Sequence, residues 1–159
     1  METEELIAPF DTIVSYFDQK LGPSILVSNS DIAEDKEMEK EISSLMDLHK
    51  PGSFFVHYFN DRISANYIYS YRSEEQIRGG QNEIMLSFVF NNSESTKGEF
   101  LRYFFTNINA YENQLKILTK WLHRKAEFKH LIDRIQTQKP TPDAVSYSKL
   151  QLLKMLQYR

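Results

Sequence analysis

The sequence predicts an α/β (α+β) domain with one five-stranded sheet and helices on both of its faces. Near the amino terminus, two short apolar runs flank a turn at Gly22-Pro23, which is typical of a β-hairpin. Between residues 53 and 90, three further apolar runs are separated by polar turns. From residue 97 the apolar spacing changes to about 3.6, the period of a helix. With a helix between the two groups of strands, the predicted order is β-β-α-β-β-β-α-α.

The composition is that of one globular domain in a reducing compartment. Eleven Phe and nine Tyr among 159 residues supply a large core. The absence of cysteine excludes disulfides, zinc ribbons and thiol nucleophiles. A formal net charge of −3 provides no overall basic field for nucleic acid, and no apolar run approaches the ~20 residues of a membrane span. We therefore expect a cytoplasmic protein with neither a nucleic-acid ligand nor a transmembrane segment.

Residues 13 to 28 predict the first hairpin. The apolar residues on either side of its turn are mostly β-branched or aromatic, which favours a pleated backbone: Ile13, Val14, Tyr16, Phe17, Ile25 and Val27. Gly22 can adopt a positive φ, and Pro23 fixes φ near the extended region. We therefore expect Gly22 and Pro23 to have a structural role in the turn.

Residues 32 to about 49 predict a helix. Ser30 or Asp31 can cap its amino terminus, and the acidic side chains of its first turns suit the positive end of the helix dipole. One face of this helix is apolar at spacings of 4, 3 and 4, through Met38, Ile42, Leu45 and His49. Pro51-Gly52 ends it.

The next three runs predict consecutive antiparallel strands at residues 53–59, 63–71 and 83–90. One face of the second strand is expected to carry Ile63, Ala65, Tyr67, Tyr69 and Tyr71, and one face of the third Ile84, Leu86, Phe88 and Phe90. The tyrosine row could be a stacking platform for single-stranded nucleic acid, with Arg72 and Arg78 supplying charge. The acidic net charge instead favours a sheet face packed beneath a helix.

Residues 97 to 138 predict either one long helix or two packed helices. Their apolar stripe runs at spacings of 4, 3, 4, 3 and 4 through Phe104, Ile108, Tyr111, Leu115, Leu118 and Leu122, and can continue through Phe128, Leu131 or Ile132, and Ile135. Neither Gly nor Pro follows Gly98 here, so nothing forces a break. One rod would reach ~60 Å, twice the width of a small domain. Either it breaks near Arg124 to Glu127, or its second half protrudes and pairs with another element.

The last residues predict an addition to a domain of residues 1–138. Lys139-Pro140-Thr141-Pro142 is a stiff linker. A final amphipathic helix at about 144–157 is indicated by Val145, Leu150, Leu153 and Met155 or Leu156. We expect residues 139–159 to pack on the domain or on a partner.

The first hairpin and the element order resemble those of longin domains. The hairpin segment is Phe17-Asp18-Gln19-Lys20-Leu21-Gly22-Pro23-Ser24-Ile25-Leu26, in which a strand, a short turn and Gly-Pro lead into the second strand. It is most similar to the amino-terminal longin domains of the nitrogen permease regulator 2-like and folliculin group and to small longin-like proteins of Asgard archaea. The resemblance covers residues 11 to 137 in element order and only this hairpin in actual sequence.

The resemblance implies a non-enzymatic longin-type scaffold. Longin domains bind small GTPases, vesicle adaptors and one another, so a dimer is implied, in which the chain pairs with itself or with a related longin or roadblock domain. Such a dimer would bind or regulate small GTPases in membrane-trafficking or signalling complexes and would contact a membrane only through a partner. Arg62, Arg72 and Arg78 lie in or near predicted loops, but none matches a family motif for a GTPase-activating arginine.

Motifs for catalysis, cofactors and metals are missing from the sequence. There is no G-x-S-x-G nucleophile elbow, and Gly79-Gly80 has neither the P-loop Lys-Ser/Thr nor a Rossmann spacing. On one helix, His123 and His130 would lie ~10 Å apart, too far to share an ion without other ligands. His49 and His57 lack a metal-binding spacing. We therefore expect no enzyme activity, cofactor or metal site.

The predicted long helix carries the best candidate for an interaction surface, because its apolar arc is wider than one sheet contact requires. The predicted interface consists of Tyr103, Phe105, Leu118 and Trp121, with Arg124 and Lys125 as rim charges. Residues 116–134 are also basic, which indicates a solvated helix face or a docking surface for an acidic partner or a membrane.

Two other classes of function stay open. A small-molecule sensor of PAS-like or profilin-like layout would need a cavity lined by aromatic side chains, and the Phe and Tyr content permits one. A profilin-like cytoskeletal regulator would use its terminal helices against the sheet.

Overall fold

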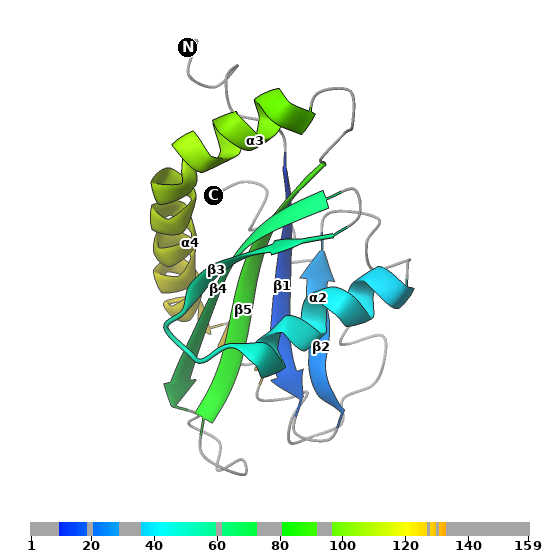
Figure 1. Cartoon of the computed structure of the whole chain (residues 1–159). Helices are drawn as coiled ribbons and strands as arrows, with labels where there is room; N and C mark the ends of the chain where they lie inside the picture. Colours follow the sequence, from blue (N-terminus) through cyan, green and yellow to red (C-terminus); the bar gives the residue numbers. More distant parts are fainter. Residues whose placement is uncertain are drawn as a thin grey trace.

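The structure is a computed structural model that describes residues 10–18, 21–28, 36–59, 62–72, 81–91, 97–126, 128–129 and 131–132. In chain order its elements are β1 (Phe10–Asp18), β2 (Gly22–Ser28), α2 (Lys36–Leu48), β3 (Phe54–Tyr58), β4 (Arg62–Arg72), β5 (Gln81–Asn91), α3 (Lys97–Thr106) and α4 (Ile108–His123). The strands form one antiparallel sheet in the order β2-β1-β5-β4-β3 (Figure 1). The α+β class and the five-stranded sheet are confirmed. The predicted linker and helix at 139–159 lie outside the described residues.

The first hairpin is built as its sequence indicates. Gly22 opens β2 with φ +83°, in the left-handed region that glycine tolerates. Just before it, the Leu21 backbone N–H donates to Oδ1 of Asp18 at 3.0 Å. Pro23 lies opposite Phe17 on an edge strand, where the missing N–H of proline is tolerated. The backbone conformation therefore favours glycine at position 22, and the edge strand tolerates proline at position 23.

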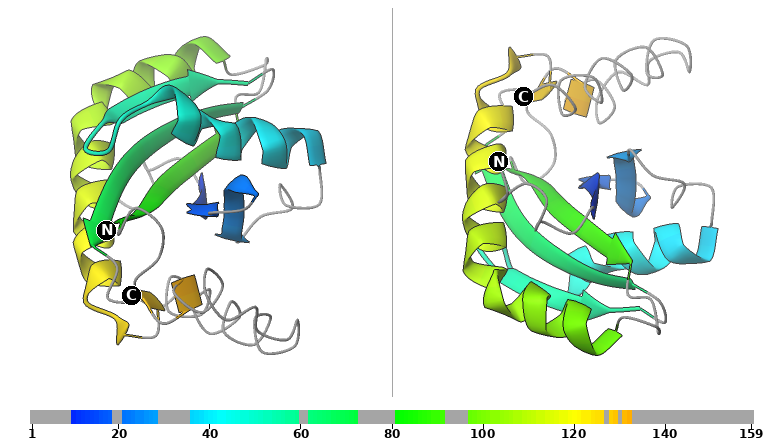
Figure 2. Two further views of the ribbon diagram at one scale, coloured as in Figure 1. Left: turned by 90° about the horizontal axis from the view of Figure 1, so that it is seen from below. Right: turned by 90° about the horizontal axis from the view of Figure 1, so that it is seen from above.

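Helices cover both faces of the sheet, as predicted, and Figure 2 shows α2 and α4 on opposite sides of it. Strand side chains alternate between two separate cores. The core under α2 contains Ile13, Phe17, Ile25, Phe55, Ile68, Met85 and Val89, together with Ile42, Leu45 and Met46 of the helix. The core under α3 and α4 contains Val14, Tyr16, Ile63, Ala65, Tyr71, Ile84, Leu86, Phe88 and Phe90. Every strand face that the period-2 pattern assigned is thereby confirmed.

The helix predicted at residues 32–49 corresponds to α2, although residues 32–35 lie outside the described part of the chain. The predicted stripe faces the sheet: Ile42 and Leu45 are buried, and Met38 packs against them. The ring of His49, just past the helix end, stacks on Phe55 with 3.5 Å between centroids. This histidine is therefore a packing residue.

The stretch predicted as one helix or two is broken at Asn107, where no break was expected. Oγ1 of Thr106 donates to the Arg102 carbonyl at 2.7 Å, and Nδ2 of Asn107 donates to the Tyr103 carbonyl at 2.9 Å. Such side-chain bonds compete with the backbone ladder, and Asn107 adopts φ −104° and ψ 10°. Figure 1 shows α3 and α4 running in different directions on either side of it. The prediction that nothing in this stretch forces a break is wrong.

A second break follows α4, in the place that the sequence allowed for one. The Arg124 N–H donates to the Trp121 carbonyl at 3.2 Å, and the Lys125 N–H to the Leu122 carbonyl at 2.9 Å. These short-range bonds tighten the last turn and end the helix. The apolar stripe nevertheless stays buried across both breaks, through Phe104, Tyr111, Leu115, Leu118, Leu122, Phe128, Leu131 and Ile132.

Candidate functional site

A groove of about 1130 Å³ lies between β4 and α4 and extends past the end of the helix. Lys116 lies over the Tyr67 ring, 5.8 Å from its centroid, and seven residues later His123 packs edge-on against Tyr71, 5.5 Å between centroids. The groove thus follows both elements in the same direction. Its described lining residues are Tyr67, Tyr69, Ser70, Tyr71, Arg72, Lys116, Thr119, Lys120, His123, Arg124, Ala126 and Lys129.

The tyrosine row forms the sheet wall of this groove. Tyr67, Tyr69 and Tyr71 share the face of β4 that α4 covers, because alternate residues of a strand point to the same side. The rings of Tyr69 and Tyr71 stack at 5.9 Å, and His123 contacts both edge-on, at 6.2 and 5.5 Å. Helix side chains therefore occupy the space beside these rings. This arrangement favours the packed sheet face over a platform for nucleic-acid bases.

The helix wall of the groove is cationic. Lys116, Lys120 and Arg124 recur every four residues, so they follow one side of α4. Arg72 joins them from the end of β4, and Lys129 from beyond the helix. No carboxylate is found among the described residues that line the groove. The local charge is therefore positive, although the formal net charge of the whole chain is −3.

The groove walls also contain incompletely bonded polar groups. The Tyr69 hydroxyl and Oγ1 of Thr119 are buried and have no hydrogen-bond partner among the described residues. Burial raises the pKa of Tyr69, so its phenol is a neutral donor at physiological pH. Lys116 pairs with Glu112 (Nζ to Oε2, 2.8 Å), and this hydrogen bond raises the pKa of Lys116. The groove thus presents both fixed cations and neutral hydroxyl donors.

The predicted interface residues differ in how far their side chains are exposed. Leu118 is 1% exposed and belongs to the core under α4, so it offers no side-chain surface to a partner. Its neighbour Ile117 is 62% exposed. Successive helix positions differ by about 100°, and Leu118 continues the buried stripe of Tyr111 and Leu115 whereas Ile117 does not. Leu118 is therefore removed from the interface, and Ile117 takes its place.

The remaining predicted residues are accessible to different degrees. Phe105 is 45% exposed, and Tyr103 is partly exposed. Trp121 packs partly on the core, with Nζ of Lys125 over its ring at 4.8 Å from the centroid. Arg124 is exposed and borders the groove. We use the term outer surface for Tyr103, Phe105, Ile117, Trp121 and Lys125.

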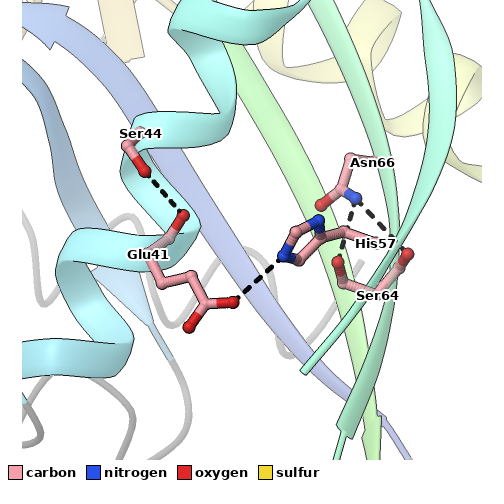
Figure 3. A network of polar contacts seen from close by, with 5 residues as sticks. All are labelled: Glu41, Ser44, His57, Ser64 and Asn66. Carbon is pink, nitrogen blue, oxygen red and sulfur yellow. Dashed lines mark hydrogen bonds and ion pairs between the residues drawn. The ribbon is translucent and has the colours of Figure 1, made fainter. Parts of the chain in front are cut away.

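A polar cluster on the opposite face contains serine, histidine and glutamate, the components of a hydrolase triad. Nε2 of His57 lies 3.0 Å from Oε2 of Glu41 and links β3 to α2 (Figure 3). Ser44, however, donates to the backbone carbonyl of Glu41 at 3.0 Å. Ser64 is fully buried and accepts a bond from Nδ2 of Asn66 at 2.9 Å. Because neither serine is bonded to the histidine in Figure 3, this cluster ties elements together and does not form a triad.

The described part of the chain shows neither a cluster of metal ligands nor a helix that could span a membrane. Within it, no group of three or more His, Cys, Asp or Glu side chains could hold a metal ion. His130 lies outside the described residues, so its predicted distance from His123 is not tested. In the same residues, no helix is both long and apolar enough to cross a membrane.

No protein-family model matches this sequence. The curated protein sequences contain no match to it either.

Sequence reasoning identified the tyrosine row and the basic stretch separately, and the structure brings them together. Arg78, which was considered with the tyrosines, lies outside the described residues. The signal that could have connected them is the side of the helix on which the basic residues lie. Lys116 and His123 lie beside the buried stripe on the flank opposite Trp121, and this follows from helical spacing alone. Which strand lies next to that flank depends on the strand order, which the sequence did not give.

Proposed function

We propose that this chain is a non-enzymatic, longin-like interaction scaffold that forms a dimer and engages small GTPases of trafficking or signalling complexes. The element order β-β-α-β-β-β-α-α and the Gly22-Pro23 hairpin support the longin likeness, since these two features carry the resemblance. The proposed domain spans residues 1–138, with residues 139–159 as an addition to it. The proposed site of action is cytoplasmic.

The observation that carries the proposal is the exposure of apolar side chains on helices that already bury another face. The core-facing stripe of α4, which includes Tyr111, Leu115 and Leu118, is at most 2% exposed. Ile117 and Phe105 are 62% and 45% exposed, so they contribute little to that core. Ile117 and Trp121 are four residues apart, so they lie together on one side of α4, and adjoining apolar side chains outside the core are typical of protein interfaces.

A second copy of the chain is the proposed occupant of the outer surface. Two-fold symmetry brings the same patch of both chains together, so each exposed apolar residue meets an apolar counterpart. A standard interface buries roughly 800 Å² per chain, which is wide enough to include residues of both α3 and α4. Lys125 and Arg124 would supply the charged rim around Trp121. The dimer would leave α2 and the β2 edge available to a GTPase.

Light scattering of the full chain at micromolar concentration tests the dimer. We expect the wild type to be dimeric and Ile117→Lys combined with Phe105→Asp to be monomeric with unchanged circular dichroism. Leu48→Lys is the matched control, because Leu48 is 70% exposed at the end of α2 on the opposite face. A monomeric wild type, or equal dissociation of the control, would refute the dimer.

The GTPase part of the proposal needs its own measurement. Purified small GTPases, each loaded with GDP or with a non-hydrolysable GTP analogue, are passed over the immobilised full chain. We expect at least one to be retained in one nucleotide state only. If none is retained while the chain is folded and dimeric, the GTPase role fails and the dimeric scaffold stands.

A further inference from the structure

We infer that the groove between β4 and α4 binds an extended segment of a partner protein with acidic side chains at alternate positions. This site borders the outer surface at Arg124, but the inference does not depend on the proposed dimer. Its first support is charge. The groove collects Arg72, Lys116, Lys120, Arg124 and Lys129, and its described lining contains no carboxylate. Lys116 already pairs with Glu112, so the positive field comes mainly from the other four, and an anionic ligand that lies between them is favoured.

The spacing of the cations matches an extended chain. Lys116, Lys120 and Arg124 are four residues apart, so successive charges rise by about 6 Å along α4. Alternate residues of a β-strand point to the same side and lie about 6.6 Å apart. Acidic side chains on one side of an extended peptide would therefore meet Lys120 and Arg124 in order, and a third would reach Lys116 in competition with Glu112.

The sheet wall offers backbone groups to the same peptide. β4 has 11 residues and its neighbour β3 only 5, so β3 covers only part of the adjoining edge of β4. The last described hydrogen bonds on this edge are made by Ile68, whose carbonyl accepts from the Gly52 N–H at 2.6 Å and whose N–H donates to the Ser53 carbonyl at 3.1 Å. Backbone groups of every second residue point to one edge of an antiparallel strand. Ser70, two residues beyond Ile68, therefore presents its N–H and C=O there, and no described strand pairs with them. An extended peptide can add to this free edge as a further strand.

Hydroxyl groups complete the recognition of carboxylates. Thr119 is 5% exposed, and its Oγ1 has no hydrogen-bond partner among the described residues, as is also true of the Tyr69 hydroxyl. Both residues line the groove. A carboxylate accepts hydrogen bonds and cannot donate them, so it suits these donors and the lysines together.

A peptide fits this groove better than the other common anionic ligands. A nucleotide base would need an open aromatic face, whereas His123 and Lys116 lie against the tyrosine rings. A lipid surface needs basic residues on an outward face beside apolar side chains that insert. Here Arg72 and Lys120 lie on the two walls of a concavity, and one wall ends in a strand edge with which no described strand pairs. These observations favour an extended protein segment.

Fluorescence anisotropy with a synthetic probe tests the inference. The probe is a short fluorescein-labelled peptide in which glutamate alternates with threonine, and the full-length chain is titrated into it. We expect saturable binding that weakens at higher salt. A peptide of the same composition with its glutamates in one block should bind several-fold more weakly, because adjacent side chains of a strand point to opposite sides. Equal binding of the two peptides would overturn the extended geometry.

The site is located with charge reversals on both walls. Arg72 and Lys120 are exposed, so Arg72→Glu with Lys120→Glu should leave the circular dichroism unchanged and weaken probe binding at least about tenfold. Lys40→Glu with Lys50→Glu changes the net charge equally at exposed positions in and just after α2, and should weaken it less than about twofold. Equal losses in both pairs would overturn the site. Binding to vesicles of phosphatidylcholine and phosphatidylserine without binding to the probe would also overturn it, in favour of a membrane.

Discussion

Ile117 and Leu118 are neighbours in α4, and we predict that replacement by alanine lowers stability strongly at Leu118 and hardly at all at Ile117. Leu118 is 1% exposed, so Leu118→Ala removes the equivalent of three buried methylene groups and leaves a cavity. At about 0.8 kcal/mol for each group plus the cavity cost, the free energy of unfolding should fall by about 3–4 kcal/mol. Ile117 is 62% exposed, so the same chemical deletion removes little buried area. The higher helix propensity of alanine offsets part of that loss, and we expect a change below about 0.5 kcal/mol.

Urea unfolding followed by tryptophan fluorescence measures both variants. Trp121 is the only tryptophan, and it packs partly against the core that contains Leu118. For a chain of this size, the loss in Leu118→Ala corresponds to a fall in melting temperature of roughly 6–16 °C. Similar losses in the two variants would mean that α4 is rotated about its axis relative to this structure. That result would also remove Ile117 from the proposed outer surface.

Three further predictions concern single residues. Burial raises the pKa of Tyr111 to about 12, above the usual value near 10, so the unfolded chain releases this proton first and stability falls as the pH rises above about 10. Urea unfolding on either side of pH 10 should show a smaller fall for Tyr111→Phe than for the wild type. Gly22 has φ +83° and open space where a Cβ would lie, so Gly22→Ala should cost roughly 1–2 kcal/mol of backbone strain, and Gly22→Asn less. The His57–Glu41 pair is 31% and 50% exposed, so His57→Ala should destabilise by less than about 1 kcal/mol, and a larger loss would show that His57 contributes through packing.

Most of the strands, the helical stretches and their buried faces could be predicted from the sequence, because each has one strong periodicity of apolar residues. Alternation along residues 63–71 assigned Tyr67 and Tyr71 to one strand face, which the structure places under α4, and spacings of 3 and 4 assigned Leu115 and Leu122 to the core. These patterns predict well because they report burial directly. The Gly22-Pro23 turn added the position of the first hairpin.

The break at Asn107 could not be read from apolar spacing, because the stripe continues across it. It depends on hydrogen bonds from the side chains of Thr106 and Asn107 to carbonyls four residues earlier. Short polar side chains have this competing option at many helix positions, and only the packing of α3 decides whether it is used. The assignment of Leu118 to an interface failed for a related reason. One apolar stripe cannot serve both the sheet and a partner, and Leu118 belongs to the stripe that the helical spacing had already indicated.

The two faces of the sheet hold their helices with different strength, and this bears on both proposed surfaces. Under α3 and α4 the aromatic rings of Phe90, Phe104 and Tyr111 contact one another, with centroids 5.0–5.4 Å apart. Under α2, some buried strand positions are polar: Ser15 of β1 and Ser87 of β5 are fully buried, and their hydroxyls have no hydrogen-bond partner in the described part of the chain.

Buried hydroxyls without a hydrogen-bond partner among the described residues occur in both layers, since Tyr69 and Thr119 lie on the α4 side, so they do not distinguish the layers. The core under α3 and α4 contains more buried apolar side chains than the core under α2, so the α2 layer is the part of the described fold that opens at the lower free energy. The outer surface and the groove both lie on α4, in the layer that is held more firmly. Binding sites work best when rigid elements hold their side chains in place, because little conformational entropy is then lost on binding. Ile117 and Lys120 are three residues apart on the exposed side of α4, and both meet that condition because the same buried stripe holds the helix in place.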